Sequence, residues 1–247
     1  MESHAHSPLD SHVGFQPTEW NLVCLAGSRE AGVRETALDK LCQCYWPAIY
    51  SYLRRTEHSP AEAEDLTQEF FFRLLRNGSI ANADPARGRF RSFLLGALHH
   101  FLADEWKHRT RERRGGFQVL ISLDEQAGEA LYQQCTSTEL PPDKVYDRAW
   151  WLAFVEHCMS RLGAEYDRAG KSEFFKTLSP FLTADPDKGE YLQIARQFEM
   201  KPATIAVAIH RLRKHFRGLV HAEAARTIPN LDELEDELRS LASLFSS

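Results

Sequence analysis

Carboxylates and histidines gather in two stretches of this sequence, and both residue types can bind metal ions or transfer protons. The candidates are Glu62, Glu64, Asp65, Glu69, His99, His100 and Asp104. A di-metal site in a helical bundle takes a Glu-x-x-His pair from each of two helices, and the stretch from Glu62 to Glu69 contains no histidine. The spacing therefore argues against a metal-dependent enzyme of this kind.

The remaining metal-binding residue types do not form a site either. His4, His6 and His12 fall in the first 17 residues, for which we expect a flexible tail, and Cys42-x-Cys44 lacks the spacing of a zinc finger. We therefore predict no catalytic residue, no metal, no cofactor and no enzymatic activity. The five cysteines have no C-x-x-C spacing, which favours reduced thiols in the cytoplasm. The sequence contains no apolar run long enough for a membrane span, and we expect no membrane partner.

Basic residues are concentrated in two segments, although the net charge of the chain is −5. Residues 85–116 contain eight Lys or Arg residues and three acids, and residues 201–217 contain five Lys or Arg residues and no acid. Contact with phosphate depends on local clusters of positive charge and not on the average over the chain. The two basic segments predict two separate contacts with nucleic acid.

The elements that must position these charges are predicted to be helices, since apolar residues recur at steps of three and four nearly throughout. We expect a helix over Thr36–Arg55, kinked or split at Pro47. Ser59-Pro60-Ala61-Glu62 reads as a capping box that begins the next helix, which Asn77-Gly78 should end. A third apolar stripe runs from Phe90 towards Arg114. The predicted fold class is all-α, with two small helical domains joined by a linker.

The second half of the chain predicts a helix-turn-helix. Residues 117–143 carry little helical signal and form the expected linker. Helices over Glu190–Phe198 and from Pro202 to about Val220 are separated by only a few residues, an arrangement in which the second helix can enter a major groove. Ile205, Ile209 and Leu212, with Phe216, should form its inner face.

Two sequence motifs, in their order along the chain, resemble those of a known protein family. The acidic, aromatic-rich stretch AEAEDLTQEFFFRLL, followed by RFRSFLLGALHHFLADEWKHRTRERR, looks like the core of bacterial sigma factors of the extracytoplasmic-function type. YLQIARQFEMKPATIAVAIHRLRKHF resembles their C-terminal DNA-binding helix-turn-helix. The resemblance implies a non-catalytic subunit that binds core RNA polymerase and directs transcription initiation at promoter DNA. It leaves open an anti-sigma factor or other regulator as a further partner.

The resemblance also implies roles for individual residues. Asp65, Gln68 and Glu69 would lie on the polymerase-binding face, while Leu66, Phe70 and Leu74 are expected in the core. The helix after them would bind the opened minus-ten element. The DNA-binding residues carried over are Arg91, His99, His100, Trp106, Lys107, Arg109 and Arg111 in the first motif, and Lys201, Thr204, His210, Arg211, Arg213 and Lys214 in the second. Trp106 has two interpretations, a stacking surface for bases or a core residue.

The sequence departs from the family pattern at several positions. His100 stands where the family often has Asn, and Ala206, Val207 and Ala208 replace polar residues near the start of the recognition helix. Glu199 occupies a turn position where Gly is frequent, so the turn should be longer or strained.

The expected domain organisation has five parts: a tail over 1–17, a sigma core domain over 18–116, a linker over 117–143, a helix-turn-helix domain over 144–226 that binds the minus-thirty-five element, and an acidic amphipathic helix over 227–247. The last helix would pack on its own C-terminal module or compete with DNA for the basic helix. Two other functions remain open: a helix-turn-helix regulator that does not bind polymerase, and a helical adaptor.

Overall fold

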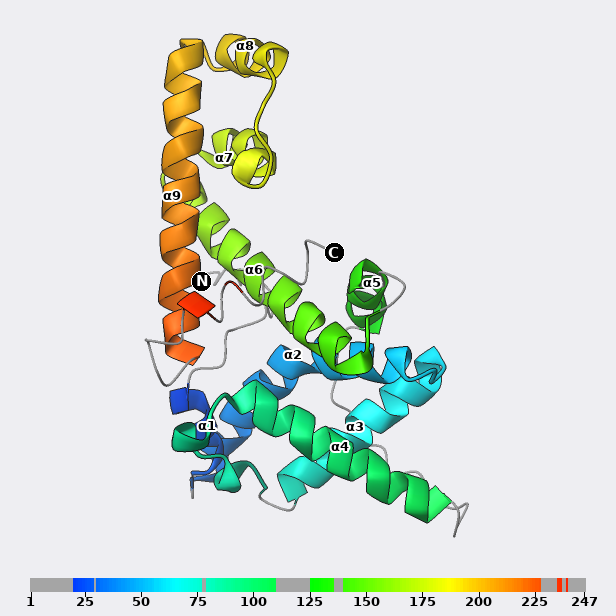
Figure 1. Ribbon diagram of the computed structural model, residues 1–247. Helices are drawn as coiled ribbons and strands as arrows, with labels where there is room; N and C mark the ends of the chain where they lie inside the picture. The colour runs from blue at the N-terminus through cyan, green and yellow to red at the C-terminus, as the bar shows by residue number, and fades with distance from the viewer. Residues whose placement is uncertain are drawn as a thin grey trace, which may run out of the picture.

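The computed structural model describes residues 20–28, 30–76, 79–109, 125–135 and 140–227, together with 235, 236 and 239. Within these residues all regular secondary structure is helical (Figure 1), which confirms the predicted all-α fold. None of the described helices is long and apolar enough to cross a membrane. The expected tail over 1–17 lies outside the described residues.

The first half of the chain builds a layer of four α-helices and two short 3-10 turns. They are α1 (Trp20–Ala26), α2 (Ala31–Arg55), α3 (Pro60–Arg76), η1 (Ser79–Asn82), η2 (Pro85–Arg87) and α4 (Phe90–Arg109). The capping box is confirmed, because the Ser59 amide donates to Glu62 at 3.1 Å and the Glu62 amide donates to Ser59 Oγ at 3.3 Å. Pro47 does not split α2, which continues through it to Arg55.

The expected linker contains a helix, α5 (Glu125–Cys135), which packs on α2. Arg54 Nε on α2 lies 2.9 Å from the Glu129 carboxylate on α5, and the Tyr50 hydroxyl donates to the same carboxylate at 2.7 Å. Hydrogen bonds from Arg54 and Tyr50 hold the pKa of Glu129 below its usual value although burial acts in the opposite direction. A pair of contacts distant in sequence therefore fixes a segment whose own helical signal is weak.

Helix α6 (Pro142–Arg168) belongs to both of the hydrophobic cores that the described residues form. Its residues from Val145 to Cys158 are buried in the same cluster as α2, α3 and α4. Leu162, one turn later, is buried in the second cluster with α8 and α9. Figure 1 shows α6 running from the α2 layer to α9. The start of the expected second domain, at residue 144, thus lies inside the first core, because α6 is continuous across the predicted boundary.

The second core is formed by the end of α6 with α7 (Ser172–Leu178), η3 (Ser179–Leu182), α8 (Lys188–Gln197) and α9 (Pro202–Thr227). Helix α9 returns along α6, to which it is joined by an ion pair between Arg161 and Glu223. Glu223 is only 3% exposed and also lies 3.4 Å from Arg226. Ala224 belongs to the first core, so the far end of α9 reaches the cluster that α6 shares with the N-terminal helices.

The predicted acidic helix over 227–247 falls almost wholly outside the described residues. One of its described residues is Glu235, whose carboxylate oxygen lies 3.4 Å from His221 Nε2 on α9. Neither the structural role expected for this segment nor its competition with DNA is tested by that contact.

Candidate nucleic-acid interface

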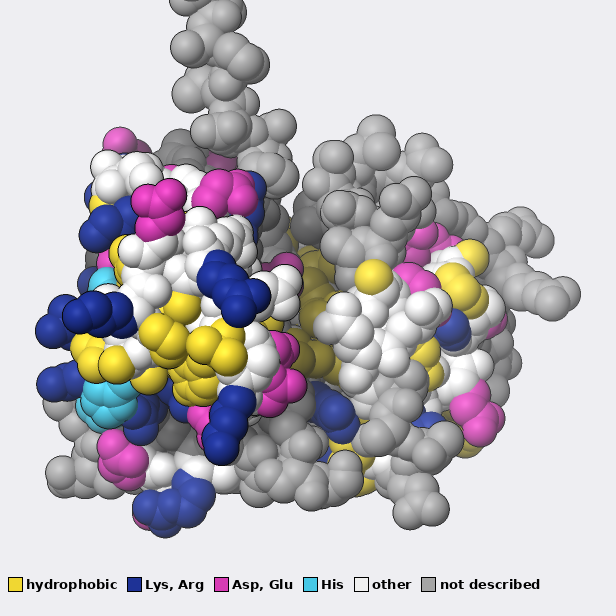
Figure 2. Space-filling model, turned by 90° about the horizontal axis from the view of Figure 1, so that it is seen from above, with side chains coloured by type: hydrophobic (Ala, Val, Ile, Leu, Met, Phe, Trp, Pro, Cys, Tyr) yellow, Lys and Arg dark blue, Asp and Glu magenta, His cyan; other side chains and the backbone are white. Residues whose placement is uncertain are grey.

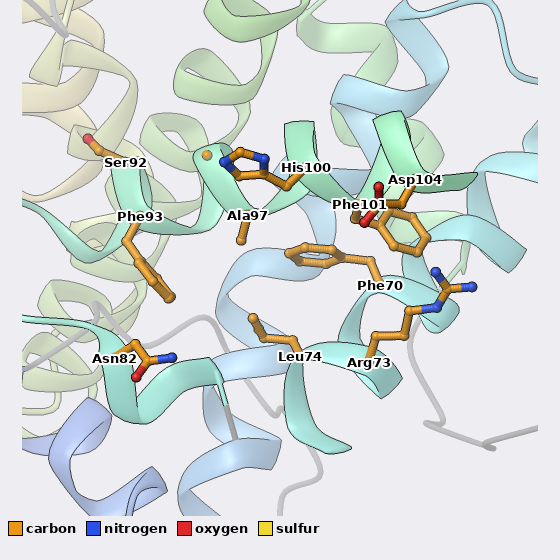
Figure 3. Close-up of a pocket in the computed structure, with 11 residues that line it drawn as sticks. Phe70, Arg73, Leu74, Asn82, Ser92, Phe93, Ala97, His100, Phe101 and Asp104 are labelled. Atoms are coloured by element: carbon orange, nitrogen blue, oxygen red, sulfur yellow. The ribbon is translucent and has the colours of Figure 1, made fainter. Parts of the chain in front are cut away.

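A cavity of about 600 Å³ opens between α3 and α4 (Figure 3). Phe70 and Leu74 from α3 and Phe93 and Phe101 from α4 give it apolar walls, and the rings of Phe70 and Phe101 meet edge to face at 5.6 Å. Its polar lining consists of Arg73, Asn82, Ser92, His100 and Asp104. An aromatic cavity with polar groups at its edge can hold a flat heteroaromatic ring and hydrogen-bond its periphery.

Arg73 links the two helices at one end of this cavity. Its Nε lies 2.6 Å from Glu69 on α3, and its Nη2 contacts Glu105 on α4. Burial would lower the pKa of Arg73, but the hydrogen bond to Glu69 and the charge of Glu105 raise it overall. The guanidinium therefore remains a permanent positive charge beside the cavity, partly neutralised by its two carboxylates.

The adjacent residues His99 and His100 have different surroundings. His100 lines the cavity, and its contact with a base stays a prediction. His99 Nε2 instead lies 3.1 Å from Asp143 at the start of α6, and its ring lies 5.6 Å from that of Tyr52 on α2. Successive residues on a helix point about 100° apart, so His100 faces the cavity whereas His99 faces Asp143 and Tyr52. Both histidines are exposed, and contact of His99 with DNA stays a prediction.

Arg91, expected to contact DNA, is a buried residue that is 7% exposed. Its Nε lies 3.4 Å from Asp147 and its guanidinium lies 5.0 Å from the centre of the Trp150 ring, both on α6. Its backbone carbonyl also accepts a hydrogen bond from the Tyr146 hydroxyl at 3.0 Å. This correction follows from tertiary packing, because α6 covers the first turn of α4.

Trp106 is 74% exposed near the end of α4, so its interpretation as a core residue is wrong. An exposed indole ring can stack on an unpaired base. The expected partners of Trp106 in DNA binding are only partly described: the backbone of Lys107 and Arg109 is helical, while their side chains and the whole of Arg111 lie outside the described residues.

The acidic face of α3 is arranged largely as the sequence predicts. Asp65 is exposed on α3, while Leu66, Phe70 and Leu74 are buried on its other side. Gln68 Nε2 donates to Glu64 at 3.0 Å, and Glu69 is held by Arg73. Asp65, Gln68 and Glu69 thus share one accessible side, with Asp65 the most available of the three to a partner.

Helices α8 and α9 follow one another across a short turn, and α8 lies across the start of α9 (Figure 1). Asp187 and Glu190 make a capping box at the start of α8, with both hydrogen bonds at 2.8 Å. Ile205, Ile209 and Leu212 are buried and Phe216 is partly buried, which confirms the predicted inner face of α9. The exposed positions include Lys201, Thr204, His210, Arg211 and Lys214.

The turn between these helices places Glu199 at a positive φ of 53°. The Met200 amide donates to the Ala195 carbonyl at 2.8 Å and the Glu199 amide donates to the Arg196 carbonyl at 3.3 Å. This pair of bonds is a Schellman motif, whose left-handed residue is usually Gly. The strain expected at Glu199 is therefore present, and the turn is short.

Arg213 differs from the other basic residues of α9, because it holds the segment that leads into α8. Its Nε donates to the Phe181 carbonyl at 2.8 Å, Nη2 donates to the Ala184 carbonyl at 2.6 Å, and Nη1 pairs with Asp185 at 2.7 Å. Three fixed bonds leave this guanidinium in a structural role, and we no longer expect it to contact phosphate.

Several residues of the candidate interface were not found by sequence reasoning. Asn82 lines the cavity although no motif marked it, and Phe93 and Asp104 line it although sequence reasoning gave them no role in DNA binding. Exposed apolar side chains around the start of α9 were not predicted to form a surface of their own. No group of three or more His, Cys, Asp or Glu residues among the described residues could hold a metal ion.

Comparison with known proteins gives one match. Residues 41–112 match the family model of sigma-70 region 2, a range that includes most of α2, all of α3 and α4, and the cavity between the last two. The searches of curated proteins and of solved structures found no match for this chain. The similarity is thus to sigma-70 region 2 and covers 72 of the 247 residues.

Proposed function

We propose that this chain is a sigma factor of the extracytoplasmic-function type, which binds core RNA polymerase and directs it to promoters. The observation that carries this proposal is the coincidence of the region 2 match with α3 and α4, which together present an acidic face, an aromatic cavity large enough to admit a base, and an exposed tryptophan. The protein acts in the cytoplasm as a binding subunit without a catalytic step of its own.

The acidic side of α3 is the proposed contact with core polymerase. Asp65 and Glu69 are four residues apart, so their carboxylates project from one side of the helix and can pair with basic side chains of the largest catalytic subunit. Arg73 already shares the charge of Glu69, which makes Asp65 the stronger attraction for a basic partner. The mainly electrostatic contact should favour rapid association that weakens at high salt.

The cavity between α3 and α4 is the proposed site for a base of the opened minus-ten element. Its volume of about 600 Å³ lies within the usual range for ligand sites, roughly 300–1,000 Å³. Phe93 and Phe101 offer apolar contact, His100 and Asn82 offer hydrogen bonds, and Trp106 gives a second stacking surface further along α4. A base can make these contacts only after it has left the duplex stack.

Helix α9 is the proposed reader of the upstream promoter element. Lys201, Arg211 and Lys214 are exposed and can contact phosphates, while Thr204 and His210 lie on the exposed side near the start of the helix. In helix-turn-helix proteins the first residues of the second helix reach base edges. Arg213 is not part of the proposed DNA contact, because its guanidinium hydrogen-bonds to backbone carbonyls of the protein itself.

In vitro transcription tests this function directly. The full chain is added to core RNA polymerase from its host with genomic DNA, and transcript start sites are mapped. We expect new, reproducible start sites that share two upstream elements and disappear when the chain is omitted. Salt-dependent DNA binding without association to core polymerase would contradict the proposal and would identify a DNA-binding regulator. Absence of both activities would identify a helical adaptor.

A further inference from the structure

The exposed surface at the start of α9 is apolar. Leu192 on α8, Met200 in the turn and Val207 on α9 are 49%, 43% and 49% exposed, respectively. Ala203 and Ala206 are also exposed, and they line an open hollow of about 420 Å³ with Tyr191 and Leu192. This apolar patch, made of Leu192, Met200, Ala203, Ala206 and Val207, is the surface from which base edges would be read.

Positive charge borders the apolar patch. Lys188 and Lys201 lie beside it at the starts of α8 and α9, and Arg211 and Lys214 follow on the exposed side of α9. Figure 2 shows apolar side chains gathered on one face of this end of the molecule, with Lys and Arg side chains around much of their edge and Asp and Glu side chains beside them. Of the nearby acids, Glu190 is occupied by its capping box, whereas Glu199 is exposed in the turn. An apolar centre within a cationic border is complementary to a major groove, where phosphates flank the base edges.

The chemistry of the patch restricts which bases it can read. In the major groove the only apolar group on a base edge is the C5 methyl of thymine, which Ala side chains and the Thr methyl contact favourably. Ala203, Ala206 and Val207 have no hydrogen-bonding group, so they cannot distinguish guanine from adenine by their acceptors and donors. Thr204, between them in sequence, supplies both a methyl and a hydroxyl group.

We propose that the apolar patch of Ala203, Ala206 and Val207, with Leu192 and Met200 at its edge, recognises thymine methyl groups in the major groove of the upstream promoter element. This inference rests on the proposed function and adds the class of base pair that α9 selects. Burial of one methyl group stabilises a complex by about fourfold in affinity, so two methyls give more than tenfold.

Deoxyuridine provides the test, because it differs from thymidine in major-groove chemistry only by the C5 methyl. A duplex library with a randomised upstream element is selected with the full chain bound to core polymerase from its host. The selected duplexes are then remade with deoxyuridine in that element alone. We expect thymine-containing elements to be selected and the affinity to fall about fourfold for each methyl contacted.

Two variants separate the methyl contact from general DNA binding. Val207→Ser should reduce the difference between thymidine and deoxyuridine duplexes by about fourfold, which corresponds to one methyl contact, with the melting temperature and the salt dependence unchanged. Leu25→Ser, at an exposed apolar residue of α1, is the matched control and should keep the full difference.

The outcomes distinguish this inference from the proposed function. Equal affinity for thymidine and deoxyuridine duplexes, with promoter binding intact, would overturn methyl recognition and leave the sigma-factor function standing. Failure of the polymerase complex to enrich any duplex from the library would overturn both the inference and the proposed function.

Discussion

Arg91 on α4 and Asp147 on α6 form an ion pair with 3.4 Å between Nε and a carboxylate oxygen. The pair is covered by Trp150, whose ring centre lies 5.0 Å from the guanidinium carbon. A basic residue from the segment that would contact DNA is thus used to fasten α4 to the helix shared by both cores.

We expect Arg91→Ala to lower the free energy of unfolding by about 2–3 kcal/mol, because it removes a buried guanidinium that pairs with Asp147 and packs on the Trp150 ring. Denaturant unfolding of the full chain measures this loss. Arg87→Ala, at an exposed arginine in η2, is the matched control and should change stability by less than about 0.5 kcal/mol. Wild-type stability of Arg91→Ala would show that the ion pair contributes nothing.

Glu199 should respond to substitution in the opposite way to Gly170. Both residues have positive φ, 53° and 67°, and both close Schellman motifs. Glu199→Gly should stabilise the protein by about 0.5–1 kcal/mol because Gly adopts this conformation without steric cost, and Gly170→Ala should destabilise it by about 1 kcal/mol. Thermal and denaturant unfolding give both values. A destabilised Glu199→Gly variant would mean that the Glu199 side chain makes a contact worth more than the strain.

Asp65→Lys should weaken the association with core polymerase by tenfold or more at physiological salt, because it reverses an exposed charge at the proposed contact. Association is measured with the full chain and purified core enzyme. Glu156→Lys, an identical charge change at an exposed position of α6, serves as the control and should bind normally. Equal affinities for the two variants would remove Asp65 from the interface.

Trp106→Ala should slow the formation of open promoter complexes by about tenfold, since base–aromatic stacking contributes about 1–3 kcal/mol per base. Its melting temperature should stay within about 1 °C of the parent protein because the side chain is 74% exposed. Strand opening is followed with a fluorescent base at the minus-ten element. Trp106→Phe should retain much of the activity, and an equal loss in initial duplex binding would argue against stacking on opened bases.

The basic residues of α9 should separate into two groups. Arg211→Ala and Lys214→Ala should each reduce the slope of log affinity against log salt by about 0.9, as expected for one lost phosphate contact in each case. Arg213→Ala should keep the slope and lower the melting temperature, because it loses three internal bonds. DNA binding by the full chain bound to polymerase, measured at several salt concentrations, checks both groups. A reduced slope for Arg213→Ala would reverse its assignment.

Local interactions explain what the sequence alone determined. The capping box at Ser59 and Glu62, the buried stripe of α3 and the inner face of α9 all follow from residues within a few positions of one another. Helical periodicity records which side of a helix is buried, and it therefore predicted the all-α fold together with the exposed acidic side of α3. The strained backbone conformation of Glu199 was also predicted from the sequence, since the short turn sets that conformation locally.

Tertiary structure decided which charged residues remain available to a partner. Arg91 and Arg213 looked equivalent to their neighbours until α6 and the segment before α8 supplied Asp147 and the Phe181 carbonyl. The same applies to α5, which Arg54 fixes to α2 through Glu129. The position of a residue in a helix determines the direction of its side chain, but not which group faces that side chain. The facing group is determined only when segments distant in sequence pack together.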